Sequence, residues 1–258
     1  GIFFLTIISY TSNIILPHGL IHNSIIFIIG FFIFIYFYFK NYILKKDVKV
    51  FALIFLFLFL SFLVFKAHDD FPYYHFPYTY YLTQENLIVG VGSLVHAFRT
   101  PSSIFYLNSL FYLPIIEYFL FNMGAILIFA FSNLILIFKI KNDYYNRQYD
   151  FIFFLSLLSF LFINIFFYRI AEHGTDRSAQ ILILILFIEV FGLYRKSIHV
   201  EKIFSKIFIL LGLIISLKAF YVLYLIILLP LLFQFKKYKY LINLFKNFYF
   251  YIFCFIGL

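Results

Sequence analysis

The chain has 258 residues, of which 65% are apolar and 12% charged, and its mean hydropathy is +1.01. A water-soluble domain needs more polar side chains than this to cover its surface, so the composition excludes an ordinary soluble globular protein. The formal net charge of +9 does not indicate a nucleic-acid partner, because the lysines occupy short loops between apolar runs. The single cysteine, Cys254, excludes an intramolecular disulfide framework and a cysteine-based metal cluster.

Eight apolar runs, followed by a ninth that begins near residue 240, are long enough to cross or nearly cross about 30 Å of hydrocarbon. They fall at 1–16, 22–39, 50–65, 119–138, 151–168, 180–194, 205–217 and 220–235. The sequence therefore predicts an all-α fold, a polytopic transmembrane helix bundle that forms a single domain over 1–258. Because the chain begins with glycine and both ends lie in apolar sequence, we expect a fragment of a longer protein, truncated at both ends.

The basic residues alternate between the two sides of this bundle. One side holds 15 of the 20, namely Lys40, Lys45, Lys46, Lys49, Lys139, Lys141, Arg147, Arg195, Lys196, Lys202, Lys206, Lys236, Lys237, Lys239 and Lys246. The other side holds Lys66, Arg99, Arg169, Arg177 and Lys218. Cytoplasmic loops carry the excess of lysine and arginine, so the sequence predicts a multi-pass protein of the cytoplasmic membrane with its lysine-rich loops inside.

The longest connection, 66–118, is expected on the outer side. A loop of this length between two spans is usually functional. Its later part, SIFYLNSLFYLPIIEY at 103–118, is amphiphilic and aromatic. This pattern is typical of helices that lie at the membrane interface, and we expect such helices here.

A first polar cluster follows the third apolar run and contains His68, Asp69, Asp70 and His75. Inserting a carboxylate into the membrane costs about 2.5 to 3.5 kcal/mol, so both acids are expected to face water or a polar cavity. Asp69 or Asp70 could act as a general base, or could bind a divalent cation together with His68 or His75. The alternative interpretation is a solvated helix end.

A second polar cluster lies between the fifth and sixth runs and contains Arg169, Glu172, His173, Asp176 and Arg177. We expect a tight turn in which Thr175 or Asp176 caps the sixth helix, whose N-terminus then faces outward. A phosphate would bind well at such a terminus, with Arg177 as a bidentate partner. Equally, the charges could pair with one another in a solvated turn.

Three further residues outside these clusters are candidates for substrate or phosphate binding: His96, Arg99 and Lys218. His96 and Arg99 follow a glycine-containing segment that could fold over a substrate, and the Lys218 ammonium could meet a lipid phosphate or mark a turn. His18 and His22 have the i, i+4 spacing of a metal pair, but they lie beside a proline and a glycine with no acid nearby. No Walker loop, nucleophile elbow or Cys/His zinc pattern occurs.

The acidic motif in KAHDDFPYYHFPYTYY, placed where a long outer loop leaves the membrane, resembles the GT-C class of membrane glycosyltransferases. The stretches DDFPYYHFPYTYYLTQ, FRTPSSIFYLNSLFYLP and AEHGTDRSAQ are similar to a family of bacterial membrane proteins linked to cell-surface polysaccharide. The resemblance covers about residues 50–220. It departs from the class in one respect, because at least two apolar runs precede the acidic loop.

The resemblance implies an enzyme that transfers a sugar from a polyprenyl-phosphate-linked donor to a cell-surface glycan or lipid acceptor, outside the cytoplasmic membrane of a bacterium. Asp69 or Asp70 would take the acceptor proton. Arg177, with His173, Arg169 or Lys218, would neutralise the departing phosphate. The expected partners are the lipid-linked donor and membrane lipid, with no nucleic acid and, as cofactor, at most a divalent cation.

Two other readings remain open from the sequence. A transporter or flippase of lipid-linked sugars predicts charges along the midplane of several helices and an inverted repeat, whereas this chain shows no repeat. A surface-polymer polymerase, ligase or acyltransferase would use the same outer arginine, histidine and acidic residues, and the sequence separates it poorly from a glycosyltransferase.

Overall fold

A computed structural model describes residues 1–40, 45–62, 69–99, 102–169, 174–195, 200–229 and 251. These residues form an all-α fold, and none of them belongs to an extended strand. The long helices are α1 (Ile2–Ile15), α2 (Leu20–Phe39), α3 (Lys45–Phe62), α7 (Met123–Tyr145), α8 (Phe151–Phe166), α9 (Thr175–Gly192) and α10 (Val200–Leu217). The shorter elements are η1 (Phe71–His75), α4 (Phe76–Gln84), α5 (Val91–Leu94), η2 (His96–Phe98), α6 (Ser103–Ser109), η3 (Tyr118–Leu120) and η5 (Ala219–Ile227).

The helices follow the apolar runs closely, because each run is long enough for a helix and is interrupted by polar or glycine-containing sequence. Seven of the eight runs overlap a long α-helix. In the last run the structure instead has the 3-10 helix η5 over Ala219–Ile227, and the run continues beyond the described residues.

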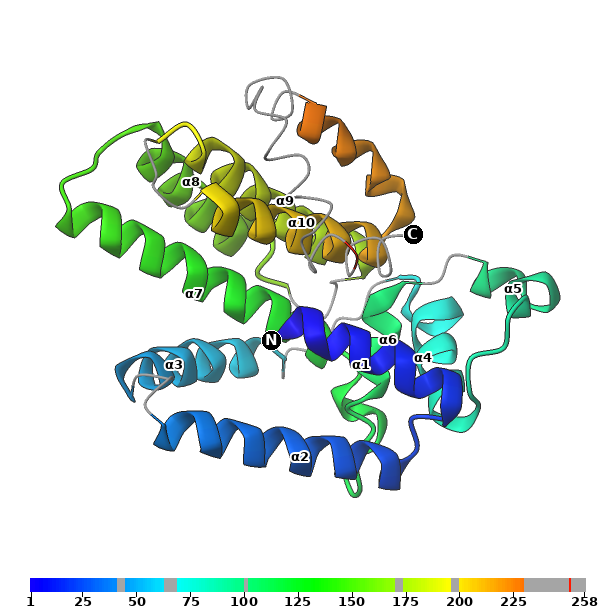
Figure 1. Cartoon of the computed structure of the whole chain (residues 1–258). Coiled ribbons are helices and arrows are strands. Elements are labelled where there is room, and N and C mark those ends of the chain that lie inside the picture. The colour runs from blue at the N-terminus through cyan, green and yellow to red at the C-terminus, as the bar shows by residue number, and fades with distance from the viewer. Residues whose placement is uncertain are drawn as a thin grey trace.

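Helices α7, α8, α9 and α10 lie side by side and form the main body of the molecule (Figure 1). Helix α9 lies between its neighbours, since it packs against α7, α8 and α10. Its side chains Ile181 and Leu186 are fully buried, together with Ile126 of α7 and Ile163 of α8. Burial on several sides agrees with the sequence of α9, which is apolar from Ile181 to Ile188.

Of the segment 103–118 expected to lie at a membrane interface, the first part is instead buried inside the protein, whereas residues 114–118 are exposed. Every residue of α6, Ser103–Ser109, is buried, and the helix packs against α1, α4, α7 and α10. The prediction of an interfacial helix is therefore wrong for this segment. Its polar side chains bond to neighbouring helices rather than to water: Asn108 Oδ1 accepts from Gly124 N–H at 2.9 Å, and Ser216 donates to Ser103 at 3.0 Å.

Helix α2 lies apart from the main body (Figure 1) and buries only Asn23. Its large apolar side chains, among them Phe27, Phe32 and Ile33, are exposed. By length and composition α2 could cross a membrane, and so could the segment Tyr118–Tyr145, which contains α7. Ile2–Ile15 and Phe151–Phe166 are apolar but shorter.

Polar groups join the turn between α1 and α2 to the rest of the fold. His18 Nδ1 lies 2.7 Å from Ser109 Oγ, and its Nε2 lies 3.1 Å from Ser12 Oγ. The Asn23 amide nitrogen donates to three backbone carbonyls, those of His18, Ser109 and Tyr112. Both nitrogens of the fully buried His18 are thus occupied by serine hydroxyls, so His18 and His22 do not form the metal pair that their spacing allows.

An ionic cluster closes the end of the bundle that carries Lys139, Lys141 and Arg147. Arg195, which follows α9, makes two hydrogen bonds of 2.9 Å to the Asp143 carboxylate and also bonds to Asp150. Asp150 in turn caps α8, accepting from the N–H groups of Ile152 and Phe153 at 3.1 Å. One guanidinium therefore joins the ends of three helices.

Candidate functional site

The two polar clusters of the sequence meet in one small pocket at the other end of α9. The pocket has a volume of about 230 Å³ and is lined by Asp70, Tyr74, His75, Gly174, Thr175, Asp176, Arg177 and Gln180. Asp70 and His75 come from the segment around η1, and the last five residues come from the start of α9. Because α9 has 18 residues, its two ends are separated by about 27 Å at 1.5 Å per residue. The pocket and the Arg195 cluster therefore lie at opposite ends of the bundle.

The local sequence explains how η1 presents its polar groups. Pro72 and Pro77 occupy the first turns of η1 and α4, where a missing backbone N–H costs nothing. The Asp70 carbonyl accepts from Tyr73 N–H and Tyr74 N–H, both at 3.2 Å, and so starts the turn. The Asp70 carboxylate is half-buried and accepts from the Tyr74 hydroxyl at 3.5 Å.

Burial and the nearby carboxylates of Asp70 and Asp176 raise the pKa of Tyr74. Tyr74 therefore stays protonated at neutral pH and acts as a hydrogen-bond donor beside Asp70. Tyr74 was not predicted as a site residue, and neither was Gln180. Both could have been found by spacing, since Tyr74 follows Asp70 by four residues and Gln180 follows Arg177 by three, which are distances typical of one helical face.

Helix α9 begins at Thr175, with Gly174 at the N-cap, and no side chain caps it. The prediction that Thr175 or Asp176 caps this helix is therefore wrong, although the start of the helix was correctly placed. Glycine is required here by a close approach: a Cβ at Gly174 would lie 2.7 Å from Cε1 of His75. With no capping side chain, the first-turn N–H groups of α9 add positive potential to the pocket wall.

Asp176 and Lys218 form an ion pair of 2.5 Å between the start of α9 and the end of α10. Their side chains are 48% and 42% exposed, so solvent reaches both. Lys218 was predicted as a phosphate ligand, and the structure places its ammonium on a carboxylate that lines the pocket. Lys218 therefore affects the pocket indirectly, because its ammonium offsets the negative charge of the Asp176 carboxylate.

The remaining predicted residues lie elsewhere. Asp69 is exposed and does not line the pocket. Arg169 donates from Nε to the Tyr168 hydroxyl at 2.9 Å and stacks over the same ring at 5.5 Å. His96 is exposed in η2. His68, Glu172 and His173 lie outside the described residues.

Arg99 belongs to a different cavity, of about 680 Å³, formed beside the glycine-containing loop 87–93. The Arg99 Nε donates to the Gly92 carbonyl at 3.2 Å. Tyr10, Tyr78 and Tyr106 also line this cavity, and the Tyr78 and Tyr106 hydroxyls bond to each other at 3.1 Å. The loop therefore lines a pocket other than the one that contains Asp70, and whether it folds over a substrate stays a prediction.

Within the described part of the chain, no group of three or more His, Cys, Asp or Glu side chains is placed to hold a metal ion. A divalent cation bound by Asp70 and His75, as predicted, would need a further protein ligand. His68, the other histidine named in that prediction, lies outside the described residues. The described residues of the pocket therefore offer a carboxylate, an arginine and a helix N-terminus.

Comparison with known families gives one match, to a family model that covers residues 1–258. The chain belongs to the DUF8201 family. That family is described as a domain of unknown function, so membership in DUF8201 assigns no activity to the pocket. No curated protein and no solved structure matches the chain.

Proposed function

We propose that this DUF8201 protein is a membrane glycosyltransferase of the cytoplasmic membrane. It transfers a sugar from a polyprenyl-phosphate-linked donor to a cell-surface glycan or lipid acceptor on the outer face. The observation that carries the proposal is that Asp70 and Arg177, which are 107 positions apart in the sequence, line one pocket of about 230 Å³. A carboxylate and an arginine facing one small cavity are the two groups that this transfer needs.

In the proposed reaction the acceptor hydroxyl oxygen attacks the anomeric carbon of the donor sugar. The Asp70 carboxylate takes the hydroxyl proton as the new C–O bond forms. The bond between the anomeric carbon and the phosphate oxygen breaks, and the lipid phosphate leaves with the electron pair. Arg177 and the N–H groups at the start of α9 balance the charge that develops on the leaving phosphate.

A membrane location is supported by the surface of the protein. Exposed apolar side chains cover α2, and a contiguous apolar surface of this kind is normally buried against lipid or another protein. Lys139 and Lys141 of α7, and Arg147 in the turn before α8, lie at the opposite end of the bundle from the pocket. With the lysines in the cytoplasm, the pocket lies on the outer side, where a lipid-linked donor displays its sugar.

Asp69 provides a matched control for the test. We compare surface glycans in cells that carry wild type, Asp70→Asn, Arg177→Gln or Asp69→Asn at equal expression. Because Asp69 does not line the pocket, we expect Asp69→Asn to retain activity, whereas Asp70→Asn should lower the transfer rate by roughly 10² to 10⁴. Normal glycans in both pocket variants would rule out the proposed transfer.

A further inference from the structure

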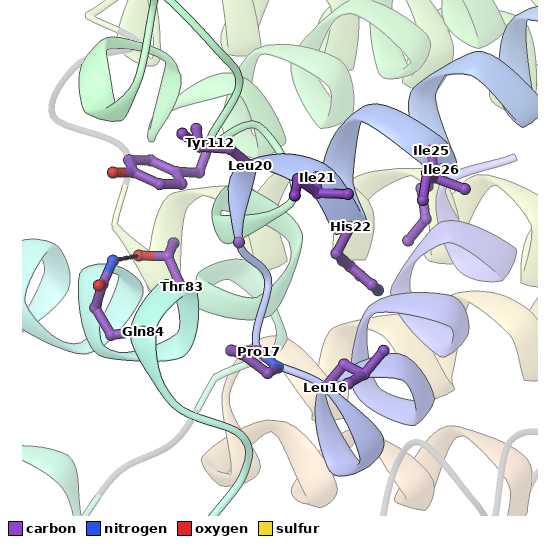
Figure 2. Close-up of a pocket in the computed structure, with 11 residues that line it drawn as sticks. Leu16, Pro17, Leu20, Ile21, His22, Ile25, Ile26, Thr83, Gln84 and Tyr112 are labelled. Atoms are coloured by element: carbon purple, nitrogen blue, oxygen red, sulfur yellow. Dashed lines mark hydrogen bonds between the residues drawn. The ribbon is translucent and has the colours of Figure 1, made fainter.

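A third cavity, of about 760 Å³, lies beside the turn between α1 and α2. Figure 2 shows its lining residues, which are Leu16, Pro17, Gly19, Leu20, Ile21, His22, Ile25, Ile26, Thr83, Gln84 and Tyr112. The walls are mainly apolar, and the His22 ring projects from the first turn of α2 toward Leu16. The volume is in the range that holds a small organic ligand. The cavity shares no lining residue with the pocket of Asp70 and Arg177.

The hydrogen bonds around Asn23 determine which nitrogen of His22 carries the proton. Asn23 Nδ2 lies 2.7 to 3.0 Å from three backbone carbonyl oxygens, and a carbonyl can only accept. The amide group therefore cannot be turned around, and Asn23 Oδ1 must be an acceptor. That oxygen lies 3.0 Å from His22 Nδ1, so Nδ1 must donate. In the neutral ring, Nε2 is then left with a lone pair.

The neighbouring histidine uses the same ring nitrogen as its donor. The rings of His18 and His22 are stacked, with centroids 5.1 Å apart and planes 9° apart. Ser109 donates its hydroxyl proton to the Tyr106 carbonyl, so it accepts from His18 Nδ1–H. The two stacked rings thus each use Nδ1 as a donor toward the buried side.

We propose that this cavity binds a long-chain alcohol, with the apolar chain along Leu16, Leu20, Ile21, Ile25 and Ile26 and the terminal hydroxyl donating to His22 Nε2. The lone pair calls for a headgroup that donates a hydrogen bond, which a hydroxyl does and a carboxylate or an ether does not. The apolar walls favour an alkyl chain, because burying each methylene group against them is energetically favourable. Ile21 and Ile25 of α2 line the cavity and are exposed, so a lipid-borne molecule has access along this helix.

The test uses the full chain in phosphatidylcholine nanodiscs, because that lipid has no hydrogen-bond donor to compete for His22. A 1-dodecanol probe with a diazirine in its chain is photocrosslinked, and the labelled residues are mapped by mass spectrometry. Competition by unlabelled 1-dodecanol is compared with competition by dodecyl methyl ether, which has a similar length but no donor. We expect labelling within residues 16–26 and about five- to tenfold better competition by the alcohol, the effect of one buried hydrogen bond.

His22→Phe removes the acceptor and keeps an aromatic ring that can stack on His18, so it should make alcohol and ether compete equally. His96→Phe, in an exposed residue outside the cavity, should leave the preference unchanged. Equal competition by alcohol and ether in wild type, or an unchanged preference in His22→Phe, would refute the site. If His22→Phe does not fold, ¹⁵N NMR of histidine-labelled wild type decides: a proton on Nδ1 of His22 and an Nε2 shift with dodecanol support the proposal, and a proton on Nε2 overturns it.

Discussion

Gly174 packs against the ring of His75 so closely that position 174 has no room for a side chain: a Cβ there would meet His75 Cε1 at 2.7 Å. This contact joins the two segments that form the polar pocket, since His75 ends η1 and Gly174 precedes α9. His75 is buried and its ring also lies 5.3 Å from that of Phe105 in α6. The ring is therefore held between α6 and the start of α9.

Gly174→Ala should push His75 away and open the pocket. We expect a loss of about 1 to 3 kcal/mol of stability, the usual cost of overpacking a buried site, and a loss of transfer activity with it. Gly192→Ala is the control, because a Cβ at Gly192 meets nothing within 4 Å. Thermal unfolding of both variants in the same detergent measures the difference. Equal midpoints for the two would contradict the close packing of Gly174 on His75.

His18 should make the protein less stable in mild acid. Burial, and second the nearby His22, lower the pKa of His18 to about 3, from an ordinary value of 6.5. The unfolded chain therefore takes up a proton below pH 6.5 while the folded protein does not, so stability falls as the pH drops from 6.5 toward 3. Unfolding midpoints between pH 7 and 4.5 measure this loss.

The matched variants for this experiment are His18→Gln and His96→Gln. Glutamine at position 18 can still bond to Ser109 but does not titrate, so the dependence on pH should become weaker. His96 is exposed, and its replacement should leave the slope unchanged. The same slope in His18→Gln as in wild type would assign the acid sensitivity to another group.

The sequence predicted the helices well because apolar runs and their polar interruptions determine where helices begin and end. It also indicated that the groups around Asp70 and Arg177 could meet, since both were assigned to the outer side. It could not choose between Asp69 and Asp70, because that choice depends on the π-helical turn of η1. The prediction for α6 was wrong, because its serines and asparagine suggest a helix face in contact with water. In the structure, Ser103 and Asn108 instead form hydrogen bonds with α10 and α7, and such contacts become visible only in the tertiary structure.

Arg195 should protect the lysine-rich end of the bundle from acid. Its hydrogen bonds lower the pKa of Asp150 to about 2, from 3.8. This stabilisation is complete above pH 3.8 and is lost as the pH falls from 3.8 to 2, a window that overlaps that of His18 only between pH 3.8 and 3. Arg195→Gln should weaken the loss of stability between pH 3.8 and 2, because Asp150 no longer bonds to the guanidinium. The same variant should also be less stable at neutral pH, because the Asp143 side chain, only 2% exposed, loses its partner. An unchanged stability at pH 7 would show that the cluster contributes nothing.

The ion pair between Asp176 and Lys218 allows the charge of the pocket to be changed in both directions. Both side chains are substantially exposed, so breaking the pair should change the stability by no more than about 1 kcal/mol. Lys218→Met leaves the Asp176 carboxylate uncompensated and should weaken binding of a phosphate-bearing donor. Asp176→Asn frees the ammonium and should strengthen it.

The measurement is the apparent KM for the lipid-linked donor at two salt concentrations, because added salt should reduce both effects if they are electrostatic. Opposite shifts in KM, with kcat little changed in either variant, are expected if the donor phosphate binds beside Arg177. Shifts in the same direction would mean that the variants act through structure rather than charge, and the phosphate would then have to bind elsewhere.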